Sequence, residues 1–134
     1  MLIDWERQAA WMLDADRVAV VSARREGVGV RLAVVTRIAG VPAFTEPMEV
    51  TRWDPPHRLD IRHGGPVAGE GSWRLEPVWG GTSFVWIEDI RLAVPVVGEF
   101  AAALYRPVMR VLMGRAMGGL RRYLIASGPR HLTP

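Results

Sequence analysis

The sequence predicts a domain of the α+β class, in which a curved antiparallel sheet of six strands wraps around a long C-terminal helix, with a short helix at the N-terminus. Two observations lead to this prediction. Segments in the first two thirds of the chain alternate apolar and polar side chains and are separated by turn residues. The last third holds one run with apolar residues at helical spacing. We therefore expect a single domain over residues 1–127, followed by a polar tail over 128–134.

The long C-terminal helix is predicted over residues 98–126. Its apolar stripe repeats every fourth residue and consists of Phe100, Leu104, Val108, Leu112, Ala116, Leu120 and Leu124. At about 1.5 Å per residue it would be roughly 43 Å long, so it needs a large partner surface. Pro107 predicts a kink or a separate first turn. Gly118 and Gly119 would let the second half pack closely on the sheet, so we expect a ligand to contact residues 104–112 and not 120–125.

Six strands and a short helix account for the rest of the chain. The helix is expected over residues 1–13, with Asp4 as its N-cap. The strands are expected at residues 16–22, 29–38, 43–53, 58–63, 67–78 and 83–92. Strands that alternate in this way have one covered face and one solvent-exposed face. Only the long helix is large enough to cover the apolar face, and a space remains between the two wherever inward side chains cannot fill it.

The composition excludes several function classes. The chain has 134 residues, no Cys, 17 basic residues that are all Arg, and 14 acidic residues. Without Cys there is no disulfide, thiol nucleophile or thiolate metal site. A net charge of +3, with Arg and acidic residues interleaved, argues against a nucleic-acid partner. No uncharged run is long enough to span a membrane, and the N-terminus lacks the pattern of a signal peptide, so we expect a cytoplasmic protein without stable membrane insertion.

Several short motifs occur in a characteristic order along nearly the whole chain. They are Asp4-Trp5-Glu6-Arg7-Gln8 with Trp11-Met12, Glu26-Gly27-Val28-Gly29, Val50-Thr51-Arg52-Trp53-Asp54-Pro55-Pro56, Gly71-Ser72-Trp73, and Gly80-Gly81-Thr82 with Trp86-Ile87-Glu88, followed by the terminal helix. In these motifs the sequence resembles the START-like, helix-grip superfamily, also called SRPBCC, and within it the bacterial polyketide cyclase/dehydrase-like members. The resemblance implies a seven-stranded sheet that grips the C-terminal helix, with a tunnel for a hydrophobic ligand between them.

The sequence departs from this family pattern at its N-terminus. The family places a strand and a helix start before the segment at Asp4-Trp5, and this chain has no room for them. Either the start methionine is set too late or the protein lacks that strand. Without it, the edge of the strand over 83–92 would be exposed, and an open edge invites pairing with another chain. A homodimer through this edge is therefore one partner hypothesis.

Three polar side chains are candidates for chemistry in the cavity. Glu88 has the same strand parity as Trp86, so its carboxylate should face the cavity, where it suits a general acid/base or a ligand hydrogen bond. The alternative for Glu88 is a strand-end residue that reaches water or pairs with an Arg. His63 could be a proton shuttle at the cavity rim, but a solvated histidine at a loop entry is the preferred interpretation. For Glu46, the neighbouring Pro47 suggests a bulge that reverses its parity, so an edge position is preferred.

Other polar and aromatic residues fit structural roles at least as well. His57 and His131 have no His or carboxylate at ligand spacing, so we predict no metal site, and we predict no cofactor. Arg52 shares the inward parity and could meet an acidic ligand, although pairing with an acidic side chain or water fits better. Trp5 and Trp11 could form a lid over the cavity mouth.

The expected ligand contacts are inward-facing side chains of the strands and of the first half of the long helix. They are Val34, Thr36, Phe44, Met48, Leu59, Ile61, Trp73, Phe84, Trp86, Glu88, Leu104, Tyr105, Val108 and Leu112. The first hypothesis is binding of a small hydrophobic or aromatic ligand such as a lipid, isoprenoid or polyketide. The second is a polyketide cyclase, aromatase or dehydratase that uses Glu88 or His63 as acid/base, favoured if a second polar group lies within hydrogen-bond reach of Glu88 inside the cavity. The third is a protein-interaction module with a filled core.

Overall fold

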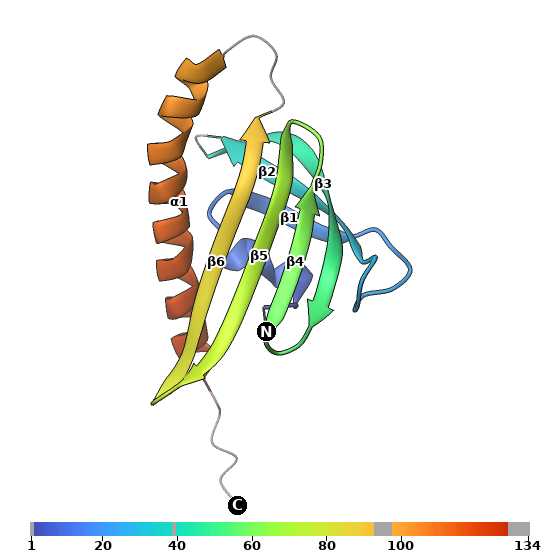
Figure 1. The fold of residues 1–134 in the computed structure, drawn as a ribbon, viewed down its shortest axis with the longest axis vertical. Helices are drawn as coiled ribbons and strands as arrows, with labels where there is room; N and C mark the ends of the chain where they lie inside the picture. The colour runs from blue at the N-terminus through green and yellow to red at the C-terminus, as the bar shows by residue number, and fades with distance from the viewer. Residues whose placement is uncertain (1, 39, 93–97, 129–134) are drawn as a thin grey trace, which may run out of the picture.

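A computed structural model describes the backbone of residues 2–38, 40–92 and 98–128, and the side chains of 2–38, 40–91 and 107–128. Figure 1 shows one curved antiparallel sheet with a long helix beside it. The elements are η1 (Trp5–Ala10), β1 (Ala15–Val20), β2 (Arg31–Ile38), β3 (Val41–Asp54), β4 (Arg58–His63), β5 (Val67–Val78), β6 (Gly81–Leu92) and α1 (Gly98–Ala126). This confirms the predicted fold class.

The sheet follows the order of the sequence. Its strands run β1-β2-β3-β4-β5-β6, each antiparallel to the next, so β1 and β6 form the two edges of the described sheet. Side chains of β3 and β4 that point into the core lie opposite one another. Val50 lies opposite Ile61 and, further along, Trp53 lies opposite Leu59. A bulge between Val50 and Arg52 changes the parity of β3. The inward position predicted for Arg52 is therefore wrong, because Trp53 takes that face and Arg52 is exposed.

The N-terminal segment lies inside the curve of the sheet. Trp5 and Trp11 are 1% and 2% exposed, so they belong to the core and do not form a lid. The Trp11 ring lies 6.1 Å from the Trp73 ring and 6.2 Å from the Trp86 ring, centre to centre. These tilted and edge-on packings are favourable aromatic geometries. The segment therefore fills the concave side of β5 and β6 with aromatic surface.

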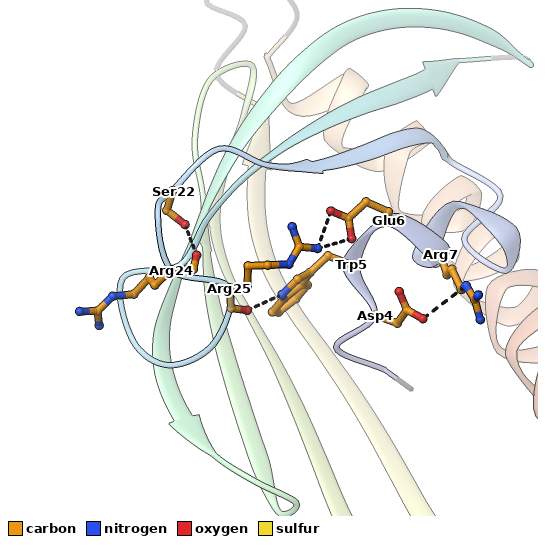
Figure 2. A network of polar contacts seen from close by, with 7 residues as sticks. All are labelled: Asp4, Trp5, Glu6, Arg7, Ser22, Arg24 and Arg25. Atoms are coloured by element: carbon orange, nitrogen blue, oxygen red, sulfur yellow. Dashed lines mark hydrogen bonds and ion pairs between the residues drawn. The ribbon is translucent and has the colours of Figure 1, made fainter.

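The same segment is tied to the long β1–β2 turn (Figure 2). The indole N–H of Trp5 donates to the Arg25 carbonyl oxygen at 2.9 Å, and the Arg25 guanidinium lies 2.6 Å from the Glu6 carboxylate. The first element is a 3₁₀ helix, and Asp4 makes no capping hydrogen bond from its side chain but pairs with Arg7 at 3.4 Å. Asp4 therefore occupies the predicted N-cap position, but its side chain does not cap the helix. The buried indole bond matters more than the exposed ion pairs, which stabilise little.

Helix α1 has the predicted bounds and runs through Pro107 as one continuous helix, without the separate first turn that was one of the two expectations. Ala116 and Leu120 are buried, as expected for the half that packs on the rest of the domain. Gly119 explains how closely it approaches, because a Cβ there would lie 2.7 Å from the Trp11 carbonyl oxygen. Val108, in contrast, is 48% exposed. Among the described residues, neither helical element combines the length and the apolar character needed to span a bilayer.

Candidate functional site

A polar cluster lies on the concave face of the sheet. Its centre is His63, the last residue of β4, which lies between a carboxylate from β3 and one from β6. His63 Nδ1 is 2.7 Å from Glu46 Oε1, and His63 Nε2 is 3.3 Å from Glu88 Oε2. Glu46 is 4% exposed, and the side chains of His63 and Glu88 are also mostly buried. Two carboxylates therefore share one imidazole in a largely water-excluded place.

The strand register brings these three side chains together. Gly71 on β5 lies opposite both Ile61 and Glu88, between the strands that carry His63 and Glu88. A Cβ at Gly71 would lie 2.9 Å from both Glu88 carboxylate oxygens and 3.1 Å from His63 Nε2. The space that the missing side chain leaves is therefore filled by the ion pair itself. Any larger residue at this position would push the two groups apart.

Neighbouring donors hold the two carboxylates in place. Thr36 Oγ1 donates to Glu46 Oε2 at 3.4 Å, and the Trp86 indole N–H donates to Glu88 Oε1. Glu88 Oε2 is buried and has no hydrogen-bond partner among the described residues, although His63 Nε2 is close enough for an ion pair. The contact between His63 and Glu88 is thus mainly electrostatic, and Glu88 keeps one oxygen that could accept a further hydrogen bond.

The charges of this cluster control the protonation of His63. Burial by itself lowers the pKa of His63, but the hydrogen bond to Glu46, the close contact with Glu88 and the negative charges of both carboxylates outweigh it and raise the pKa from 6.5 to about 9. His63 is therefore an imidazolium at neutral pH, and it can donate a proton but not accept one. Burial also raises the pKa of Asp14, and the Glu46 and Glu88 charges add to that effect.

Two of the sequence-based interpretations are corrected here. His63 is not a solvated loop residue, because it is the buried partner of two carboxylates. Glu46 is not at an edge, because β3 lies between β2 and β4, and the register of β3 shifts at Ala43 and after Val50 but not at Pro47. The alternation of side chains along β3 and β4 already predicted inward positions for Glu46 and His63. The preferred interpretations instead followed from the neighbouring residues, Pro47 and Gly64. Asp14 was missed, since it precedes β1 and has no strand parity.

A cavity of about 430 Å³ lies at one end of the domain, beside Leu120 and Leu124 of α1, and thus at the half of the helix where no ligand contact was expected from the sequence. Its lining is almost entirely apolar, with Arg58 and Thr82 as the polar exceptions. The lining residues are Leu2, Ile3, Trp53, Pro55, Pro56, Arg58, Leu59, Trp73, Leu75, Thr82, Phe84, Leu120 and Leu124. This volume falls within the usual range for small-molecule sites. None of the charged residues of the polar cluster lines this cavity.

The predicted ligand contacts are distributed over several places. Leu59, Trp73 and Phe84 line the cavity. Val34 and Ile61 are in the core, and the Trp86 ring packs against the rings of Trp11 and Trp73. Thr36 and Glu88 belong to the polar cluster. Met48 lines a second depression, of about 350 Å³, together with His63. Phe44 and Leu112 are partly buried and Val108 is exposed, whereas the side chains of Leu104 and Tyr105 lie outside the described residues.

The donor set gives no sign of a metal centre. No group of three His, Asp or Glu side chains within the described ranges is arranged to hold a metal ion. The depression lined by Met48 and His63 instead gives His63 a route to solvent, through a second opening bordered by Arg31, Arg62 and Gly64. The described part of the chain therefore contains two features with possible functions. One is the apolar cavity, and the other is the buried proton donor His63 with its two carboxylates.

The comparisons with known proteins agree with this architecture. The crystal structure of TTHA0849 from Thermus thermophilus matches with a TM-score of 0.75 at 24% identity, over 94% of this chain and 86% of that one, which shows a shared fold. No curated protein matches the sequence. Residues 2–124 match the family described as polyketide cyclase / dehydrase and lipid transport. Since that match covers most of the chain, this protein belongs to the polyketide cyclase/dehydrase and lipid transport family.

Proposed function

We propose that this protein binds a small hydrophobic or aromatic molecule, such as a lipid, isoprenoid or polyketide, in the cavity beside Leu120 and Leu124. The observation that carries the proposal is the lining of that cavity, in which Trp73, Phe84 and Leu59 face a space with two polar side chains among the described residues. Apolar burial of about 25 cal/mol per Å² would drive binding. Arg58 and Thr82 would orient a polar end of the ligand at the rim.

The cavity can be tested with a neutral fluorescent apolar probe, N-phenyl-1-naphthylamine, and with neutral long-chain alcohols as competitors. Leu124→Arg places a charge in the lining, and we expect it to weaken probe binding by about tenfold, because a charge in an apolar site is poorly solvated. Ile125→Arg is the matched control, since Ile125 is the neighbouring, largely exposed residue and does not line the cavity. Equal affinity in both variants, or no increase of the unfolding midpoint with any apolar ligand, would count against the proposal.

The second candidate is an enzyme of the cyclase, aromatase or dehydratase type. The observation that favours it is His63, a buried proton donor 3.3 Å from Glu88, although neither His63 nor the Trp86 indole lines the described cavity. With its raised pKa, His63 would act as a general acid toward a carbonyl or a leaving hydroxyl. Turnover of a poly-β-ketone that is lost in His63→Gln but kept in His57→Gln, a matched control at an exposed histidine outside the polar cluster, would favour this function over binding alone.

A homodimer remains a prediction. Its support is the position of β6 at an edge of the described sheet, with Val85 and Ile87 exposed on its outer face. A cytoplasmic location also remains a prediction, supported by the absence of Cys from the sequence.

A further inference from the structure

Exposed apolar side chains gather at the end of the domain where the cavity opens. The turn between β5 and β6 carries Trp79, which is fully exposed, and the last turn of α1 carries Ile125, which is 71% exposed. Leu124 and Ile3 are partly exposed and line the cavity together with residues of the β3–β4 turn and of β6. Figure 1 shows the β5–β6 turn, the end of α1 and the N-terminal segment at the same, lower end of the molecule. We call Ile3, Trp79, Leu124 and Ile125 the apolar end.

Positive charge accompanies this apolar end on helix α1. The described side chains of the helix include Arg110, Arg115, Arg121 and Arg122, all exposed, and none of them lies within 4.0 Å of a carboxylate in the part of the chain that the structure describes. The sequence from residue 98 onward contains six Arg and one Glu, whereas the residues before it contain 11 Arg and 13 acidic residues. The surplus of positive charge therefore belongs to the C-terminal segment.

Apolar and aromatic tips beside exposed Arg residues are the features that bind an anionic lipid surface. A fully exposed Trp is typical of side chains that lie at the headgroup level of a bilayer, with an apolar ring and a polar N–H. Trp79 projects from a tight turn and not from a broad flat patch, which fits insertion into headgroups better than docking on a protein. Asp54 and Glu76, both exposed near the same end, reduce the electrostatic attraction, so the apolar contacts must carry much of the binding.

We propose that the apolar end docks peripherally on the surface of an anionic phospholipid bilayer, with Trp79 at the headgroup level and Arg121 and Arg122 against the lipid phosphates. The cavity would then open toward the bilayer, since Ile3 and Leu124 belong to both the apolar end and the cavity lining. A hydrophobic molecule could pass between membrane and cavity with little exposure to water. This inference concerns the surface and does not depend on which ligand the cavity holds.

The test is vesicle flotation with the full chain, using vesicles of phosphatidylcholine alone and of phosphatidylcholine mixed with phosphatidylglycerol. We expect binding to the mixed vesicles and much weaker binding to the neutral ones. Trp79→Ser should weaken binding by about tenfold, because the ring no longer reaches the interface. Arg121→Gln with Arg122→Gln should weaken it by roughly fivefold per Arg at low salt, and by less at high salt.

Matched controls lie at the other end of the sheet. Ile38→Ser with Val41→Ser removes two exposed apolar side chains beside the β2–β3 turn, and Arg17→Gln with Arg91→Gln removes two exposed charges elsewhere. These variants should bind vesicles as the unmodified protein does. The proposal is overturned if the protein does not float with mixed vesicles, if neutral vesicles bind equally well, or if the control variants lose as much binding as the apolar-end variants. Probe binding in solution is measured separately, so a failure here leaves the cavity proposal standing.

Discussion

The buried pair of His63 and Glu46 makes the stability of the protein depend on pH. Because the pKa of His63 is raised from 6.5 to about 9, the folded protein holds this proton more tightly than the unfolded chain does. At 1.36 kcal/mol per pH unit, the difference corresponds to roughly 3 kcal/mol of stability. This stabilisation is complete below about pH 6.5 and is lost as the pH rises through about 9.

The protonation of Asp14 changes the stability of the protein with pH in the same direction as that of His63. Its pKa is raised by burial and by the neighbouring carboxylates, so the folded state favours its protonated form. The stability that Asp14 contributes therefore falls as the pH rises above the ordinary value of 3.8. The free energy of unfolding should be highest at mildly acidic pH and should decrease toward alkaline pH, before any Arg titrates.

The informative perturbation is Glu46→Gln. It keeps the size of the side chain but removes the charge 2.7 Å from His63 Nδ1, so the pKa of His63 should fall. The loss of stability between about pH 6.5 and 9 should shrink from roughly 3 to roughly 1.5 kcal/mol, since Glu88 remains. Glu49→Gln is the matched control, because Glu49 lies on the same strand, opposite Arg62, and makes no hydrogen bond or ion pair with His63 among the described residues.

Two measurements check this prediction. Urea unfolding at several pH values gives the free energy of unfolding, and NMR titration of the imidazole signals gives the pKa of His63 directly. The chain has three His residues, so a His63→Gln variant identifies the signal of His63. The reasoning is refuted if His63 titrates near 6.5 in the folded protein, or if Glu49→Gln and Glu46→Gln change the pH dependence equally.

Two glycine substitutions test the close contacts of the fold. Gly71→Ala should leave the fold intact but displace the Glu88 carboxylate, whose oxygens lie 2.9 Å from the new Cβ, and so lower the pKa of His63 in the same NMR titration. Gly81→Ala, which meets nothing within 4 Å, should not change it. Gly119→Ala should destabilise the protein by about 1–3 kcal/mol in urea unfolding, because its Cβ would meet the Trp11 carbonyl oxygen at 2.7 Å. Gly114→Ala has open space around it and should stabilise helix α1 by up to roughly 1 kcal/mol. If Gly114→Ala and Gly119→Ala had the same effect, the close approach of α1 to Trp11 would not exist.

Much of the fold was predictable because it depends on local periodicity. Strands β4 and β5 and helix α1 have the bounds expected from their patterns. The six strands pair in sequence order, which the short turns between β2 and β6 favour. The inward position of Glu88 follows from strand parity alone. These features are determined by the alternation of side chains and by turn residues, both of which can be read within a few positions of the chain.

The site was harder to predict because it depends on contacts between distant segments. A bulge after Val50 moved Arg52 outward, and the register of four strands brought Glu46, His63 and Glu88 around the missing side chain of Gly71. Their protonation depends on distances and burial that no single segment contains. The sequence by itself determined the strands, the long helix and the face of residues in regular strand segments, such as Glu88, but not the face of Arg52 beyond the bulge. Only the tertiary structure decided that Trp5 and Trp11 fill the core, that the described cavity lies at Leu120 and Leu124, and that His63 carries a charge, because these depend on which side chains share a space.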